Sequence, residues 1–245
     1  MLVLSVGMQK SGSAYLYNII NDLLAASGKA DARTIKAKYG LDNMLKWHNN
    51  NLVQHNPYHL FKLIRISLAE GSFAVKSHNG PTRTLKFLTR LGLVKLIYVY
   101  RDPRDVLVSA IDHGKKILAE GQNHTFAQMV DFDKALKRVH NWIGIWEEYS
   151  KMKRVLRVKY EDLMMNPTAI VDRIVSYLNL SVNAQLIERI LWTYNKENKE
   201  ADMTGLHFNK GMIGRHRAEL TTSQLRMINE TLGKRIAAMG YQNAG

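Results

Sequence analysis

A glycine-containing turn near the start of the chain carries the residue types of an anion-binding site. Residues 7–13 read GMQKSGS and stand between a short apolar run at residues 3–6 and a stretch with helical apolar spacing. Backbone amides of such a turn, the positive end of the next helix and the Lys10 ammonium can together bind a phosphate-like group. We therefore predict a strand, an anion-binding loop and a helix in this order.

The position of the lysine separates this turn from a Walker-type nucleotide loop. A Walker loop reads G-x-x-x-x-G-K-[ST], with the lysine directly after the second glycine. Gly7 and Gly12 have that separation, but Lys10 precedes Gly12 by two positions and Ser13 stands where the lysine is required. This spacing disfavours an ordinary kinase that uses Mg-ATP, so a P-loop small-molecule kinase is kept only as an alternative hypothesis.

Arg101 offers a second anion contact. It follows a strand-like run at residues 95–100, and Asp102-Pro103 then predicts the start of a helix that carries Ser109 two turns further on. A guanidinium at the end of a strand and a hydroxyl on the following helix can both reach one phosphate. Taken alone, the segment would also suit a surface turn with Arg101 in an ion pair.

His78 is a candidate general base. It follows a strand-like run at residues 72–76, and an imidazole titrates near neutrality, so it can accept a proton from a reacting hydroxyl. The alternative for a lone histidine after a strand is a polar cap or a satisfied core residue.

Alternating strand and helix patterns must position these side chains. Strand-like runs occur at residues 3–6, 72–76, 95–100 and 154–159, with helical stretches between them. This alternation predicts an α/β fold, in which a central parallel sheet is flanked by helices, and we expect one domain over residues 1–245. Asn166-Pro167 predicts another helix start, and residues 221–224 resemble a capping box. Residues 31–60 and 196–216 resist assignment and are predicted to be loops that close over a ligand.

Composition narrows the class of protein. The 245 residues are 46% hydrophobic and include no cysteine, which excludes disulfides, thiolate zinc sites and a cysteine nucleophile and fits a reducing compartment. The apolar start is too short for a signal peptide, and no run approaches the ~18 residues of a membrane span, so we expect a cytoplasmic protein. The net charge of +14 favours anionic partners. A nucleic-acid-binding protein is a second alternative, although no RNP-type strand or zinc finger is present.

In this order, the motifs resemble the family of sulfotransferases that use 3′-phosphoadenosine 5′-phosphosulfate (PAPS). The family's 5′-phosphosulfate loop reads K-S-G-T-T-W or close to it. The corresponding residues here are Lys10, Ser11, Gly12, Ser13, Ala14 and Tyr15. The resemblance implies that this loop binds the donor. Ser13 keeps the first hydroxyl, Ala14 lacks the second, and Tyr15 supplies the ring that packs on adenine.

Further motifs extend the resemblance over residues 1 to about 240. Residues 76–78 match K-[ST]-H, residues 160–163 match Y-E-D-L, and residues 208–217 are similar to the R-K-G-x-x-G-x-W-K loop that covers the 3′-phosphate. The implied nucleotide contacts are Arg101, Ser109, Tyr160, Asn209, Lys210 and Gly211. Asn209 replaces the family's arginine and can supply only a neutral contact, while His216 replaces its tryptophan.

The resemblance also implies a P-loop NTPase-like fold and a mechanism. His78 would take the acceptor's proton, Lys10 would neutralise the departing 5′-phosphate and Lys76 would support the sulfuryl oxygens. Ser109 would hold Lys10 away from the donor until an acceptor arrives. The co-substrate would be PAPS, the product adenosine 3′,5′-bisphosphate (PAP) and the partner a small-molecule acceptor. No metal and no nucleic acid would take part.

The sequence leaves the acceptor and the oligomeric state open. Residues 31–70, 112–124 and 196–208 should shape the acceptor pocket, and their polar character favours a polar acceptor carrying a hydroxyl or an amine. Trp47, His55, Tyr58 and His59 are candidates to line it. Pro57 lies between His55 and His59, and no acidic residue completes an H-E-x-x-H pattern, so a zinc site there is disfavoured.

Overall fold

A six-stranded sheet forms the centre of the molecule. The computed structural model describes residues 1–47, 49–122, 124–195, 198 and 211–242. The strands are β1 (Leu2–Gly7), β2 (Leu45–Lys46), β3 (Asn51–Leu52), β4 (Phe73–Ser77), β5 (Val94–Tyr100) and β6 (Val155–Lys159). Their order is β2-β3-β4-β1-β5-β6, and only the β2–β3 pair is antiparallel. The four strands predicted from the sequence are confirmed as β1, β4, β5 and β6 and are all parallel to one another.

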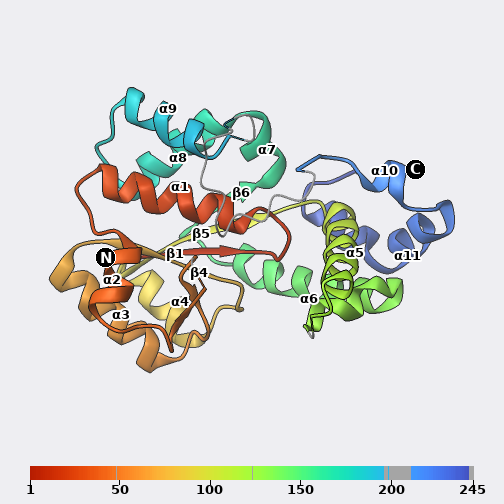
Figure 1. Ribbon diagram of the computed structural model, residues 1–245, viewed down its shortest axis with the longest axis horizontal. Helices are drawn as coiled ribbons and strands as arrows, with labels where there is room; N and C mark the ends of the chain where they lie inside the picture. The colour runs from red at the N-terminus through yellow and green to blue at the C-terminus, as the bar shows by residue number, and fades with distance from the viewer. Residues whose placement is uncertain (48, 123, 196–197, 199–210, 243–245) are drawn as a thin grey trace.

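Helices cover both faces of the sheet, as Figure 1 shows. Their bounds are α1 (Ser13–Ala26), α2 (Ala32–Lys38), α3 (Pro57–Glu70), α4 (Arg83–Arg90), α5 (Pro103–Ala119), α6 (Phe132–Ser150), α7 (Tyr160–Met165), α8 (Pro167–Leu178), α9 (Ala184–Thr193), α10 (His216–Glu219) and α11 (Thr222–Ala238), with a 3₁₀ helix η1 (Thr125–Val130). Within the described part of the chain, no helix combines the length and the apolar character that a membrane span needs.

Two hydrophobic layers follow from the alternation of side chains along the strands. In β1, Leu2, Leu4 and Val6 point into the larger layer, where helices α2, α3, α4, α6 and α11 pack. Val3 points into the smaller layer, which is formed with α1, α8 and α9. Because both faces are covered, the parallel strands are almost continuously apolar, and polar side chains gather where the strands end.

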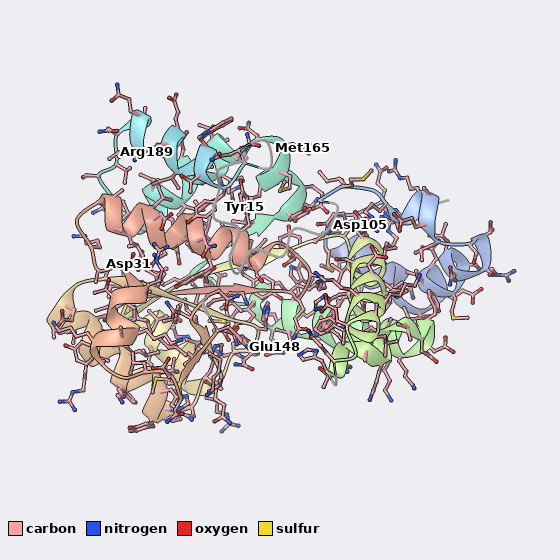
Figure 2. All side chains as sticks on the ribbon, viewed as in Figure 1. Tyr15, Asp31, Asp105, Glu148, Met165 and Arg189 are labelled. Atoms are coloured by element: carbon pink, nitrogen blue, oxygen red, sulfur yellow. The ribbon has the colours of Figure 1, made fainter. Side chains whose placement is uncertain are left out.

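The predicted helix starts agree with the structure. Asp102 accepts a hydrogen bond from the Arg104 amide at the start of α5, and Asn166 does the same for the Ala169 amide at α8. Thr221 and Gln224 form the reciprocal capping box of α11. Asp105, in the first turn of α5, faces the segment that precedes α10 (Figure 2).

The prediction that residues 31–60 form loops was wrong. This stretch contains α2, the β2–β3 hairpin and the start of α3, with Asp31 and Asn56 as the two helix caps. Helix α2 buries only Ala32 and Ile35, and each hairpin strand has two residues. Elements this short show too few apolar positions to establish a period. In the other predicted loop, residues 196–216, only residue 198 and residues 211–216 are described, and His216 already begins α10.

Candidate functional site

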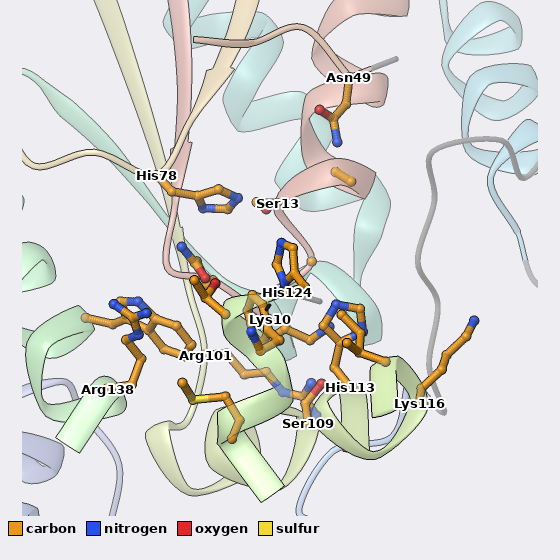
Figure 3. A pocket seen from close by; sticks show the side chains of 18 of the residues that line it. Lys10, Ser13, Asn49, His78, Arg101, Ser109, His113, Lys116, His124 and Arg138 are labelled. Atoms are coloured by element: carbon orange, nitrogen blue, oxygen red, sulfur yellow. Dashed lines mark hydrogen bonds between the residues drawn. The ribbon is translucent and has the colours of Figure 1, made fainter. Parts of the chain in front are cut away.

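A cavity of about 740 Å³ lies where β1, β4 and β5 end (Figure 3). The carboxyl ends of parallel strands are the usual place for a ligand in such folds. Ten of the residues predicted as site residues line it: Lys10, Gly12, Ser13, Ala14, Tyr15, Lys76, His78, Arg101, Ser109 and Tyr160. Gly211 lines it as well, so the structure brings together predicted residues from five separate segments.

Three predicted residues are not placed at the cavity. The Ser11 side chain is fully buried and points into the protein, where its hydroxyl donates to the carbonyl oxygens of Met8 (2.5 Å) and Val99 (3.3 Å). Ser11 therefore braces the loop against β5. Asn209 and Lys210 lie outside the described residues.

The loop between β1 and α1 has the conformation of an anion cradle. Gly12 has a φ of 76°, and a Cβ placed there would lie 2.8 Å from the Tyr160 ring, so this position requires glycine. No side chain caps the first turn of α1, whose N-cap is Gly12, and Ser13 and Ala14 face the cavity there. The amides and the dipole of a 14-residue helix are therefore directed at the cavity.

Lys10 brings a positive charge to this cradle. Burial, assisted by the charges of Arg101 and Lys116, lowers the pKa of Lys10 to about 8, with Asp112 opposing the shift. Its ammonium lies 5.7 Å from the centroid of the Phe126 ring. An anion that enters the cradle would favour the charged form of Lys10.

Lys76 and His78 are in direct contact. Lys76 Nζ is 2.8 Å from His78 Nε2, and His78 Nδ1 is 2.7 Å from the carbonyl oxygen of Gly7. Because a carbonyl can only accept, Nδ1 carries the proton and the Nε2 lone pair accepts from Lys76. Lys76 Nζ also donates to Asn51 Oδ1 at 3.4 Å.

Burial changes the acidity of both partners. It lowers the pKa of Lys76 to about 7. It also lowers the pKa of His78 to about 3, together with the charges of Lys76 and Lys10 and against the Gly7 hydrogen bond. In this arrangement the imidazole is neutral at physiological pH, and its proton-accepting nitrogen is directed at the Lys76 amino group.

Arg101 is held between Tyr160 and Asp105. Its guanidinium stacks 4.4 Å from the Tyr160 centroid, and Nη2 donates to Asp105 Oδ2 (3.2 Å) and to the Met212 carbonyl oxygen (2.5 Å). Arg101 Nε is buried and has no hydrogen-bond partner among the described residues. Arg101 lines the cavity, and a guanidinium N–H left without a partner beside it is suited to a phosphate oxygen.

Asp105 links the same arginine to the segment before α10. Its carboxylate accepts from the Gly214 amide (2.7 Å) and from the amide and Nδ1 of His216 (3.0 and 2.7 Å). Burial raises the pKa of Asp105, but the His216 and Gly214 hydrogen bonds and the charge of Arg101 outweigh it and hold the pKa at about 2. Asp105 was not a predicted site residue, since Gly214 and His216, which it joins to Arg101, lie more than 100 positions away in the sequence.

The remaining wall of the cavity was predicted only in part from the sequence. It comprises His113 and Lys116 of α5, His124 and Phe126 at η1, and Arg138 and Trp142 of α6. Residues 112–124 were expected to shape an acceptor pocket, and His113, Lys116, Ile117, Glu120, Gln122 and His124 from that range do line the cavity. The i, i+4 spacing of Arg138 and Trp142 in the sequence could have predicted that these two side chains share one face of a helix.

Trp47, His55, Tyr58 and His59 were candidates to line the acceptor pocket. Of these four described residues, only Trp47 lines the cavity. His55 is buried, and its Nδ1 lies 3.1 Å from the Gly80 carbonyl oxygen. Tyr58 and His59 belong to the first turn of α3 and pack on each other with centroids 5.8 Å apart. Among the described residues, no group of three histidines and carboxylates has the geometry to hold a metal ion.

Comparison with known proteins gives a family model that matches nearly the whole chain. The family model described as "Sulfotransferase domain" matches residues 2–240. Luciferin sulfotransferase of Photinus pyralis is 31% identical over 103 residues, which is 40% of this chain and 27% of the relative. The 3-alpha-hydroxysteroid sulfotransferase of Cavia porcellus is 24% identical over 169 residues, 60% of this chain and 57% of the relative. The matched part therefore spans about a quarter to just over half of these relatives.

Two solved structures share the fold. Mouse sulfotransferase SULT7A1 complexed with PAP superposes with a TM-score of 0.62 at 18% identity, covering 96% of this chain and 84% of that one. Retinol dehydratase in complex with androsterone and the inactive cofactor PAP superposes with a TM-score of 0.61 at 18% identity, covering 96% and 80%. At this level of identity the likeness establishes a common architecture.

Proposed function

The chain belongs to the sulfotransferase domain family, and on that premise we propose that it transfers a sulfuryl group from PAPS to a hydroxyl or amine of a small, polar acceptor. PAP would be the second product. We further propose that residues 1–245 act as one sulfotransferase domain. We propose the cytoplasm as its location, because a chain without cysteine fits a reducing compartment.

The observation that carries the proposal is the convergence of three cations and one imidazole in a single cavity. Lys10, Lys76 and Arg101 all line it, and so does His78. Sulfuryl transfer gains mainly from in-line positioning and from cations near the leaving group, without a covalent enzyme intermediate. These residues supply that charge without a metal ion.

The residues present fit the donor. The Gly12 cradle and the N-terminus of α1 suit the 5′-phosphosulfate, and the unpartnered Arg101 Nε together with Ser109 suits the 3′-phosphate. Tyr15 and Tyr160 provide aromatic surface, and Gly211 an amide. We carry Asn209 and Lys210 forward as proposed phosphate contacts. When bound, the donor supplies a sulfuryl group activated by its bond to phosphate.

We propose that His78 is the base and that Lys76 controls it. The Gly7 carbonyl holds the proton on Nδ1, so Nε2 is the nitrogen that can accept. While Lys76 Nζ remains 2.8 Å away, that lone pair is occupied. Movement of the Lys76 amino group to the sulfuryl oxygens would free Nε2. The loss of this neighbouring positive charge and the negative charge of the bound donor would both raise the imidazole pKa.

In the reaction, the acceptor oxygen or nitrogen forms a bond to sulfur while the bond from sulfur to the phosphate oxygen breaks. The acceptor's proton passes to His78 Nε2, and the electron pair of the broken bond remains on PAP. Lys10 stabilises the charge that develops on the 5′-phosphate. Ser109 is the proposed partner that withholds Lys10 from the donor until an acceptor is bound.

A calorimetric titration tests the donor site. Wild type and Arg101→Ala are titrated with PAP, AMP, ADP and Mg-ATP. We expect binding that depends on the 3′-phosphate and falls at least tenfold in Arg101→Ala, because charge-assisted hydrogen bonds of about 1.5–3 kcal/mol are lost. Preference for Mg-ATP with indifference to Arg101 would instead indicate a kinase. Salt-dependent retention on nucleic acid with no response to PAP would indicate a nucleic-acid-binding protein.

A further inference from the structure

Part of the cavity is not used by the proposed donor site or by the base. Its surface comes from α5, η1 and α6 and includes His113, His124, Phe126, Arg138 and Trp142. Figure 3 shows Arg138 and Lys116 on opposite sides of this view of the cavity, with His113 and His124 between them. This region, termed here the α6 wall and defined by those five residues, is where an acceptor would contact the protein.

The charge of the lining is strongly one-sided. Among the described lining residues, Glu120 is the only carboxylate, and its oxygen lies 3.6 Å from the ammonium of Lys116. Arg215 also reaches the cavity, but it pairs with Asp112 and Glu219. The field on the acceptor side of the cavity is therefore positive after these pairs are accounted for.

Arg138 is a cation of the cavity lining that has no role in the proposed donor site. No hydrogen bond or ion pair joins its guanidinium to another residue in the described ranges, in contrast to Arg101 and Arg215. It stands one helical turn before Trp142 on α6, so both side chains project from the same face of the helix towards the cavity. A free guanidinium offers two parallel N–H donors to an oxyacid anion.

An aromatic cluster adjoins this arginine. The Phe126 ring lies 6.1 Å from that of Trp142, meets His113 edge-on at 4.8 Å and stacks with His124 at 5.6 Å and an interplanar angle of 10°. Trp142 is buried, and Phe126 is half-buried. A flat apolar body can pack on such rings, and the acceptor's reactive hydroxyl would then extend towards His78.

From this geometry we infer that the acceptor is an aromatic hydroxy acid, whose carboxylate is bound by Arg138 and whose ring rests on Phe126 and Trp142. The inference rests on the proposed function, because it names the acceptor class for the same cavity. It makes Arg138 a specificity-determining residue that acts in acceptor binding and has no part in donor binding.

Three phenols of matched size test the inference: 4-hydroxyphenylacetate, its neutral amide and the cationic tyramine. Initial rates with PAPS, and binding to the enzyme–PAP complex by calorimetry, are measured for wild type, Arg138→Gln and Lys137→Gln. Lys137 is an exposed cation on the same helix that is not among the lining residues, so its variant loses the same charge without touching the cavity.

We expect wild type to prefer the acid over the amide by about tenfold to a hundredfold, through KM, with tyramine poorest. Arg138→Gln should lose this preference, while Lys137→Gln should keep it and PAP affinity should be equal in all three proteins. Equal use of acid and amide by wild type, or an acid preference that survives in Arg138→Gln, would overturn the inference. If none of the phenols is turned over, the binding preference on the enzyme–PAP complex decides in the same way. Failure of PAP itself to bind wild type would overturn the proposed function instead.

Discussion

Lys76 Nζ donates to His78 Nε2 at 2.8 Å, so the nitrogen of the proposed base is occupied by the same side chain that is proposed to stabilise the transferring group. The contact arises because the two residues are two positions apart at the end of β4 and therefore project to the same side. Lys76 is buried and His78 is half-buried, and the loss of solvent lowers the pKa of each. Their proton states are consequently linked to whether an anion occupies the cavity.

Replacing His78 tests its role as the base. His78→Ala should lower kcat by ~10²–10⁴, since that is the usual contribution of a general base. PAP affinity should stay within a few-fold of wild type because the side chain bonds to Gly7 and Lys76 and is not assigned to the nucleotide. Turnover and PAP calorimetry on the same preparation measure both quantities. Full turnover in the variant would remove His78 from the mechanism.

The pH dependence of stability tests the state of Lys76. Its pKa is lowered from 10.5 to about 7 in the folded protein, so between these values the unfolded chain binds more protons. The free energy of unfolding should therefore rise with pH, by about 1 kcal/mol from pH 7 to pH 8 for this one group. Urea titrations at several pH values should show this rise in wild type and its loss in Lys76→Met.

The matched control for that experiment is the exposed Lys137→Gln, which should keep the wild-type slope. The window stops at pH 8 because Lys10, with its pKa lowered to about 8, adds a rise of the same sign that grows as the pH approaches and passes 8. An equal slope in wild type and Lys76→Met would mean that the buried amine keeps its ordinary pKa.

Asp105 should support donor binding through Arg101 and without touching the nucleotide. Asp105→Asn removes the charge that orients the Arg101 guanidinium and weakens the anchor of Gly214 and His216. We expect PAP affinity to fall roughly tenfold, as a charged hydrogen bond is worth about 1.5–3 kcal/mol. Calorimetry on Arg101→Ala, Asp105→Asn and the double variant forms a mutant cycle. The double variant should bind PAP more tightly than the sum of the two single losses predicts, and strict additivity would show that the residues act separately.

Gly114 sets the position of Phe126 in the α6 wall of the cavity. A Cβ at this residue of α5 would lie 2.6 Å from the Phe126 carbonyl oxygen and 3.1 Å from the Val130 amide, so Gly114→Ala must push η1 away. We expect a loss of about 1–3 kcal/mol in stability and a raised KM for the acceptor, with PAP affinity unchanged. Thermal unfolding, acceptor kinetics and PAP titration separate these effects.

Gly144→Ala on α6 is the matched control. Its new Cβ would meet only the end of the Arg235 side chain, at an ordinary 3.5 Å, so the variant should gain roughly 0.5–1 kcal/mol from helix propensity. The α6 wall would not be the acceptor site if Gly114→Ala left the KM for the acceptor unchanged, or if Gly144→Ala raised that KM equally.

Local sequence determined much of the fold and of the donor side of the cavity. Short apolar runs bounded by polar residues identified β1, β4, β5 and β6, and Asp102, Asn166 and Thr221 marked three helix starts. Since the parallel strands end at one edge of the sheet, residues placed just after them, such as Lys10, His78 and Arg101, were bound to meet. Periodicity, capping and the period-two alternation of a strand are all properties of neighbouring residues.

Tertiary structure alone decided the rest. Helix α2 and the β2–β3 hairpin were missed because elements of two to seven residues carry no measurable period. Asp105 pairs with His216 across 111 positions, and Phe126 reaches Trp142 only because η1 packs on α5 at Gly114. The direction of the Ser11 hydroxyl, which faces the Met8 carbonyl instead of the cavity, likewise depends on how the loop packs against β5. These contacts depend on the packing of segments far apart in the chain, and no local pattern in the sequence encodes their distances.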